Sequence, residues 1–179
     1  MQLFLRKTIL MLLASIAILG LSCCATNKTI SDYDAIFNVK WYLVKYVDTD
    51  NATEENAFET IKDIPLKSDD ICWVIFTDDT LCHAVPKISN ANVYRGYGVK
   101  NRFEGYYKVD AKKKEIQFFS FFRTLAGCRG GMKANEVEKR FMSSFRNTTN
   151  YKLEGDTLLL YYDDGKKYVQ FQKKGLNNK

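Results

Sequence analysis

Histidine is nearly absent from this chain, since His83 is the single histidine among 179 residues. Zinc sites in proteins usually combine three or four ligands, often at short spacings such as Cys-x-x-Cys, and the sequence contains no such spacing. A Ser-His-Asp or Cys-His catalytic arrangement would have to use His83, and no nucleophile with an oxyanion hole is placed beside it. The sequence therefore predicts a structural or surface histidine, no metal, no other cofactor and no enzyme.

Dense runs of one charge are also scarce, although the formal net charge is +6. The one dense basic run, Lys112-Lys113-Lys114, lies where a turn is expected. Nucleic-acid-binding domains usually carry a basic helix or strand surface interleaved with aromatic residues, so no nucleic-acid partner is expected. Two prolines and ten glycines exclude a low-complexity chain, and the length fits one compact domain.

The amino terminus resembles a bacterial export signal. Arg6 and Lys7 precede an apolar run over residues 8–21, which is shorter than the roughly 20 residues of a transmembrane helix. The following Leu-Ser-Cys-Cys resembles a lipobox, and this resemblance implies that Cys24 becomes the new amino terminus and carries acyl chains such as palmitate. Cys23 fits less well, because Gly20 would then occupy the leucine position. Ordinary cleavage after Ala25, which would release a soluble secreted protein, is the alternative.

This reading divides the chain into four parts: a lipoprotein signal peptide at 1–23, a flexible tether at 24–38, a folded domain at 39–173 and a disordered tail at 174–179. Ile36 and Phe37 are the tether residues most able to dock on the domain. The expected location is the bacterial cell envelope, outside the cytoplasm, in the periplasm or at the cell surface.

Eleven Tyr and twelve Phe favour strands. A tight turn at Asp78-Asp79 is expected to join two strands into a hairpin, and Gly105 suggests a bulge or a close backbone contact. Residues 48–70 form either an excursion loop or a short helix from Thr53 to Ile61, and residues 86–97 form a loop. Alternation and turn signals predict strands at 41–47, 71–77, 80–85, 103–109, 115–122, 150–153, 157–162 and 167–172.

One helix is expected in the second half of the chain. Asn135 is the predicted cap, Glu136 and Glu138 lie in the first turn, and the helix runs to about residue 148. Its apolar stripe, which lays the helix onto the sheet, consists of Val137, Phe141, Ser144, Phe145 and Thr148. The predicted fold is α+β and mostly β: an antiparallel, partly open, barrel-like sheet with this amphipathic helix packed on it.

Three cysteines belong to the expected exported domain, so at least one stays unpaired within the chain. A two-residue turn at Asp78-Asp79 would place Cys72 and Cys82 on opposite faces of the hairpin, which disfavours a bond between them. Cys82 and Cys128 are the preferred disulfide pair.

The surplus of aromatic residues suggests an apolar ligand cavity if the sheet curls into a barrel. The candidate lining is Trp73, Phe118, Phe119 and Phe121, and a packed core is the alternative. A hydrolase that uses Asp78 and Asp79 is a weaker hypothesis, because adjacent turn acids usually only form turns.

Taken in order, the motifs resemble the META domain family, which includes a bacterial heat-shock lipoprotein. The residues that carry this resemblance span roughly 39–173: Trp41, Leu43, Asn101, Phe103, Gly105, Tyr107, Thr124, Leu125, Cys128, Glu138, Phe141, Leu153, Gly155, Asp156, Leu158 and Leu160. Many family members have a cysteine where this chain has Lys100, so any pairing of that cysteine with the one matching Cys128 is lost here. The resemblance implies a compact, mostly β fold, exported and attached to the membrane, and no catalytic residues.

The function expected from the sequence is that of an exported envelope lipoprotein, a non-enzymatic interaction or stress-related module. Its partners would be the membrane, through the amino-terminal lipid, and an envelope protein or small molecule. A lipoprotein that binds a small apolar ligand is the alternative.

Overall fold

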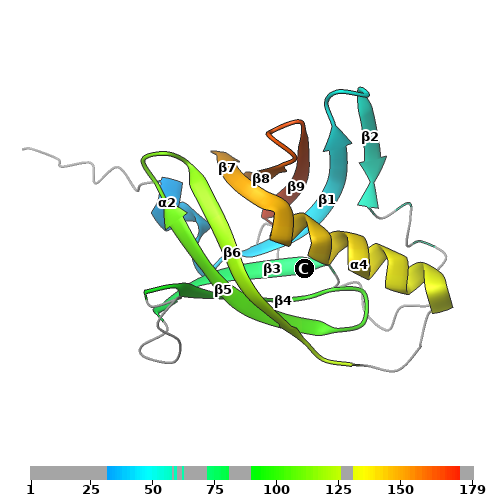
Figure 1. The fold of residues 1–179 in the computed structure, drawn as a ribbon, viewed down its shortest axis with the longest axis horizontal. Helices are drawn as coiled ribbons and strands as arrows, with labels where there is room; N and C mark the ends of the chain where they lie inside the picture. The colour runs from blue at the N-terminus through cyan, green and yellow to red at the C-terminus, as the bar shows by residue number, and fades with distance from the viewer. Residues whose placement is uncertain are drawn as a thin grey trace, which may run out of the picture.

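The computed structural model describes residues 32–57, 59, 62, 72–80, 90–125 and 131–173. Nine strands in this part of the chain form one antiparallel sheet, and a long helix crosses its opening (Figure 1). The elements are α2 (Asp32–Ile36), β1 (Lys40–Asp48), β2 (Thr53–Asn56), β3 (Trp73–Thr80), β4 (Asn92–Tyr97), β5 (Arg102–Asp110), β6 (Glu115–Arg123), α4 (Gly131–Asn147), β7 (Thr148–Glu154), β8 (Thr157–Tyr162) and β9 (Lys167–Lys173).

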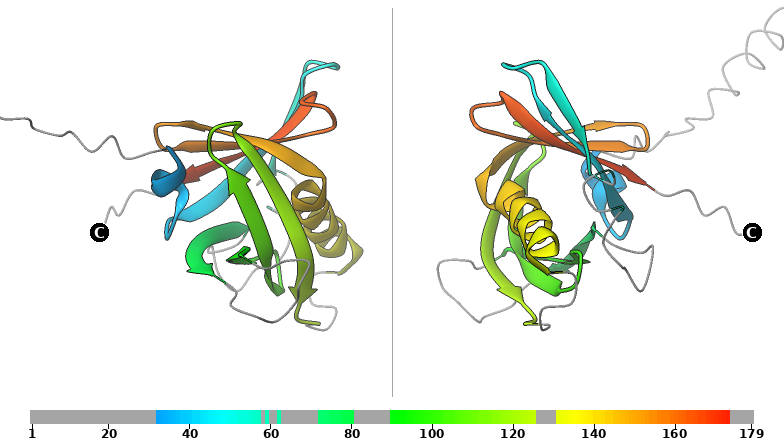
Figure 2. Two further views of the ribbon diagram at one scale, coloured as in Figure 1. Left: turned by 60° about the vertical axis from the view of Figure 1, so that its left-hand side comes forward. Right: turned by 90° about the vertical axis from the view of Figure 1, so that its right-hand side faces the viewer.

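The sheet closes on itself. Its strand order is β2-β1-β3-β4-β5-β6-β7-β8-β9, and β1 also pairs with β9, so the strands from β1 to β9 form a ring with β2 on its outside. Among the described residues the ladder between β6 and β7 consists of one pair, Glu115 with Asn150. The two strands then diverge, and α4 lies along the opening (Figure 2). The predicted mostly β, antiparallel fold with one helix in the carboxyl-terminal half is confirmed.

The core lies between the inner face of the ring and one face of α4. Aromatic side chains from β4, β5, β6 and β9 meet those of the helix. Each fully buried Phe or Leu contributes about 1.5–3 kcal/mol. The bulkiest members are Trp41, Phe76, Tyr94, Phe103, Tyr107, Phe141, Phe145 and Phe171. The expected apolar stripe of the helix is confirmed for Val137, Phe141, Ser144 and Phe145, which are all buried. The fifth predicted residue, Thr148, is also buried but is the first residue of β7.

A β-bulge at Ser120 interrupts β6. Gly105 pairs with Phe121 and Tyr106 pairs with Phe119, so Ser120 is an extra residue, with a φ of 46°. A Cβ atom on Gly105 would lie 2.2 Å from the Ser120 carbonyl oxygen and 2.5 Å from the Tyr94 hydroxyl oxygen. Only glycine fits there, which confirms the close contact expected at this position.

The predicted hairpin at Asp78-Asp79 is wrong. β3 continues through both residues to Thr80 and pairs with β4, which lies in the segment expected to be a loop. Trp73 therefore faces Tyr97, and not a residue of the segment 80–85. Both acids have partners that favour the extended strand: Asp78 accepts a hydrogen bond from Asn38, and Asp79 forms an ion pair with Arg95.

Two other local predictions also need correction. Residues 53–56 form neither a helix nor a loop but the exposed strand β2, which pairs with the second half of β1. The helix α4 begins at Gly131, four residues before the expected cap Asn135. Glu138 consequently lies within the helix and is buried, instead of standing in its first turn.

The end of the expected tether is part of the folded domain. Residues 32–36 form α2, Ile36 is buried, and Phe37 makes a bridge to Phe76. The indole nitrogen of Trp41 donates a hydrogen bond to the Ile36 carbonyl. Residues 32–38 therefore dock on the domain through Ile36 and Phe37. The rest of the expected tether, residues 24–31, lies outside the described residues. None of the helices in the described residues has the length and apolar character needed to span a bilayer.

Candidate functional site

The structure does not bring the four predicted ligand residues into one cavity. The Ser120 bulge directs Phe118 and Phe121 to the inside of the ring, while Phe119 lies on the opposite face with Trp73. Phe118 packs edge-on against Tyr94, with ring centroids 5.0 Å apart. Phe121 stacks on Phe103 at 5.4 Å. These two inward rings belong to the packed core, which was the stated alternative.

The outer face of β3, β4, β5 and β6 carries a cleft of about 600 Å³, which lies in the size range of small-molecule sites. We call it the arginine cleft, because three of its lining residues are arginines. Its lining residues are Trp73, Arg95, Gly96, Arg102, Phe103, Glu104, Phe122, Arg123 and Thr124. Outward positions of neighbouring strands meet there: Arg95 is opposite Glu104, and Glu104 is opposite Phe122.

The three arginines of the cleft differ in their partners. Arg95 lies 3.2 Å from a carboxylate oxygen of Asp79, and Arg123 lies 3.9 Å from one of Glu138. The Arg102 guanidinium makes no hydrogen bond or ion pair with any residue of the described chain. Exposed ion pairs contribute little, about 0–1 kcal/mol, so the guanidinium of Arg95 also remains available to an incoming anion.

Apolar surface lies beside this charge. Phe122 is 58% exposed, and its ring meets Tyr106 edge-on at a centroid distance of 6.2 Å. Leu125, the second residue after β6, is 86% exposed. The ammonium of Lys40 lies 4.1 Å from the centroid of the Trp73 ring. Exposed large apolar residues rimmed by polar groups are typical of interaction sites, and arginine with aromatic residues is the composition enriched in protein interfaces.

A buried carboxylate supports the edge of the cleft from behind. Glu138 of α4 accepts hydrogen bonds from the backbone N–H groups of Lys100 and Asn101 at 2.9 and 3.1 Å, and another from the Asn101 side chain. Thr124 donates its hydroxyl proton to the Asn101 side-chain oxygen at 3.2 Å. Because Asn101, Thr124 and Glu138 come from three different segments, this network fixes α4 against the β4–β5 turn and the end of β6.

Of the five cysteines in the sequence, Cys72 alone lies in the described residues. Cys72 is a buried free thiol, and burial raises its pKa to about 12, with a smaller contribution from the Glu138 charge. A thiol that keeps its proton is a poor nucleophile. Cys24, Cys82, His83 and Cys128 lie outside the described residues. Within the described ranges, no group of three or more His, Cys, Asp or Glu side chains could hold a metal ion.

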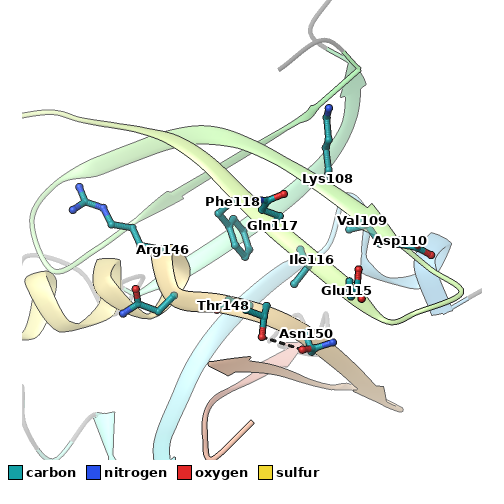
Figure 3. Close-up of a pocket in the computed structure, with 12 residues that line it drawn as sticks. Lys108, Val109, Asp110, Glu115, Ile116, Gln117, Phe118, Arg146, Thr148 and Asn150 are labelled. Atoms are coloured by element: carbon teal, nitrogen blue, oxygen red, sulfur yellow. Dashed lines mark hydrogen bonds between the residues drawn. The ribbon is translucent and has the colours of Figure 1, made fainter. Parts of the chain in front are cut away.

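A second hollow, of about 560 Å³, opens where β6 and β7 diverge (Figure 3). Ile116 and Phe118 form its apolar floor, and Arg146 and Asn150 contribute to its polar rim. Figure 3 shows the Phe118 ring pointing into the space between β6 and the chain that leads from α4 into β7. Phe118 is the one predicted ligand residue that lines this hollow.

The closed antiparallel ring with a helix across its opening defines the structural class, and sequence comparison identifies the family. The META domain family matches residues 85–175, so the chain belongs to this family. This match begins well after residue 39, where the resemblance noted above starts. No curated protein matches the sequence.

Two solved structures share the fold. A DUF4847 family protein from Bacteroides vulgatus aligns with a TM-score of 0.55 and 16% identity, covering 82% of this chain and 99% of its own. A protein from Burkholderia xenovorans aligns with a TM-score of 0.52 and 14% identity, covering 83% of this chain and 89% of its own. At these identities the likeness supports the fold alone.

The arginine cleft was missed by sequence reasoning. One signal was present: in β5 the polar residues Arg102 and Glu104 alternate with Phe103 and Gly105, which indicates one outward and one inward face. The contribution of Arg95 was hidden, because its segment was expected to be a loop.

Proposed function

We propose that this META domain protein is an exported, lipid-anchored envelope protein that acts as a non-enzymatic interaction module, and that the arginine cleft is its binding surface. The observation that carries the proposal is the combination of three arginines with Trp73 and the exposed Phe122 in one cleft. A stress-related role, as in the heat-shock member of the family, would be exercised through contacts made at this surface.

The short length of the expected tether supports the choice of the arginine cleft as the binding surface. Cys24 precedes α2 by eight residues, which can span at most roughly 29 Å when fully extended. The domain is therefore held close to the membrane at the α2 side. The end of β6 and the start of β5 lie at the side of the domain away from α2 (Figure 1). Arg102 and Arg123, the cleft residues at these two strand ends, therefore lie on the side of the domain away from α2.

The alternative function, binding of a small apolar ligand, is favoured by one observation. The hollow between β6 and β7 exposes part of Phe118 above the buried Ile116 (Figure 3). Native mass spectrometry of the chain extracted from its own membranes would reveal a co-purifying small molecule. The same spectrum gives the mass of the amino-terminal species and so tests the lipid on Cys24.

Site-specific photocrosslinking in cells tests the interaction module. A photoreactive phenylalanine analogue is placed at Phe122, and at Tyr168 of β9 as the control, in chains with Cys24 intact. The proposal expects a discrete crosslinked protein with the analogue at 122, reduced by Arg102→Ala and absent with the analogue at 168. Equal products at both positions, or none at 122, would refute the assigned surface. A Cys24→Ser chain that stays in the membrane fraction would refute the anchor.

A further inference from the structure

We infer that the arginine cleft binds an acidic segment of a partner protein, with a carboxylate on Arg102 and an apolar side chain against Phe122 and Trp73. This inference rests on the proposed function, because it specifies the chemistry of the partner at the same surface. Each part of the recognition follows from a separate feature of the cleft.

The carboxylate is indicated by the charge of the cleft. Its lining contains three arginines and one glutamate, so arginine is the dominant charged residue of the cleft. Arg95 and Arg123 already have acidic neighbours, whereas the Arg102 guanidinium has none in the described chain. A planar guanidinium binds a carboxylate through two parallel hydrogen bonds, a geometry that lysine cannot provide.

The position of Arg102 is fixed before any partner arrives. Its backbone N–H donates to the Thr124 hydroxyl at 3.1 Å, and its carbonyl accepts from the Thr124 backbone N–H at 3.0 Å. The Thr124 hydroxyl is in turn held by Asn101. Because the backbone is already ordered, binding restricts only the side chain, which lowers its entropic cost.

The size and apolar wall of the cleft exclude a simple inorganic anion as the preferred occupant. A volume of about 600 Å³ suits a group of the size of several side chains. The exposed Phe122 and the nearby Leu125 offer apolar contact beside the charge. An extended acidic peptide supplies a carboxylate and a neighbouring apolar side chain together.

A lipid surface is the competing occupant, since arginine and aromatic residues also suit an anionic membrane interface. The position of the cleft argues against it. The end of β6 and the start of β5 lie away from α2, the element nearest the expected anchor (Figure 1). The cleft residues Arg102 and Arg123, at these strand ends, therefore lie on the side of the domain opposite the point where the expected anchor would join it.

Tryptophan fluorescence offers a direct test, because the chain has two tryptophans and only one of them lines the cleft. Trp41 is 1% exposed and reports on the core. The full chain is reconstituted in phosphatidylcholine nanodiscs and titrated with acidic capped peptides that contain Asp, Glu, Phe and Leu. Peptides of the same sequences with Asn and Gln in place of the acids are the control ligands. Trp73→Phe identifies the signal as that of the cleft.

The inference expects a saturable emission change that is absent in Trp73→Phe, weakens with added salt, and is at least about tenfold weaker for the amide peptides. Arg102→Ala should weaken binding about tenfold, whereas Arg146→Ala, an exposed arginine outside the cleft, should leave it unchanged. Equal affinity for both peptide sets, or for wild type and Arg102→Ala, would overturn the inference. So would an absence of binding by all the acidic peptides.

A second experiment distinguishes an acidic peptide from an anionic lipid surface as the occupant of the cleft. An Arg102-dependent change in Trp73 emission when phosphatidylglycerol is added to the nanodiscs, without peptide, would assign the cleft to the membrane and overturn the inference. If acidic peptides fail while crosslinking from position 122 persists, the acidic partner is refuted and the interaction module stands. If crosslinking from position 122 also fails, both are refuted.

Discussion

The contact between Glu138 and the β4–β5 turn leads to a prediction that two variants and their combination can test. Glu138→Ala removes the acceptor of three hydrogen bonds and leaves the buried Asn101 backbone and side-chain donors without it. Hydrogen bonds to a charged group contribute about 1.5–3 kcal/mol each, and a buried donor left without a partner costs about 1–3 kcal/mol. We expect a loss of about 3–5 kcal/mol in the free energy of unfolding.

Gly98 provides the second half of the test. A Cβ atom there would lie 2.9 Å from a carboxylate oxygen of Glu138. In Gly98→Ala the Glu138 carboxylate would therefore have to shift away from its hydrogen-bond donors. We expect this variant to lose about 1–2 kcal/mol. When Glu138 is already alanine the obstruction is gone, and Gly98→Ala should be neutral or stabilising by up to about 1 kcal/mol, because alanine restricts the unfolded chain.

Equilibrium unfolding in urea, followed by tryptophan fluorescence and circular dichroism, measures all four members of this cycle. The expected coupling is at least about 1 kcal/mol, and additivity within about 0.5 kcal/mol would refute the contact. Glu136→Ala, an exposed acid on the same helix, is the matched control and should change stability by less than about 0.5 kcal/mol.

Three further predictions concern the core. The Tyr46 hydroxyl is buried without a hydrogen-bond partner in the described residues, whereas that of Tyr107 donates to a β3 carbonyl at 2.9 Å. Thermal unfolding should therefore show Tyr46→Phe neutral or stabilised by about 1 kcal/mol and Tyr107→Phe destabilised by about 1 kcal/mol, and the reverse order would contradict the assignment. Gly105→Ala should lose about 2–4 kcal/mol in urea unfolding, because its Cβ cannot avoid the bulge; wild-type stability would disprove the close contact. Burial raises the pKa of Cys72, so its thiol stays protonated at pH values at which the thiols of an unfolded chain ionise. Peptide mass mapping after iodoacetamide treatment should therefore find this residue alkylated only in denaturant. Rapid labelling of the native chain would contradict its burial.

Segments with strong local signals could be predicted from the sequence. The final meander follows from its turns, where Gly155 and Gly165 both adopt positive φ as tight turns require. The helix stripe follows from the spacing of Val137, Phe141 and Phe145, all of which are buried. In each case the residues that specify the element are neighbours in sequence.

The partner of β3 could not be predicted in this way. Asp78-Asp79 is a good local turn signal, but contacts from distant segments keep it extended, namely those of Asn38 and Arg95. β4 itself contains Asn92, Arg95 and Gly96 and resembles a polar loop. Tertiary contacts here outweigh local preference, as they often do in sheets.

The composition of the arginine cleft depends on a single irregularity in β6. With strict alternation, Phe118 inside the ring would place Ser120 and Phe122 inside as well, and Phe121 outside. The bulge shifts the register by one residue, so that Phe121 joins the core and Phe122 becomes 58% exposed in the cleft. It is accommodated opposite Gly105, where any larger residue would collide with the Ser120 carbonyl. The same glycine thus determines which phenylalanine stabilises the fold and which one is presented to a partner, so a substitution there should affect stability and cleft binding together.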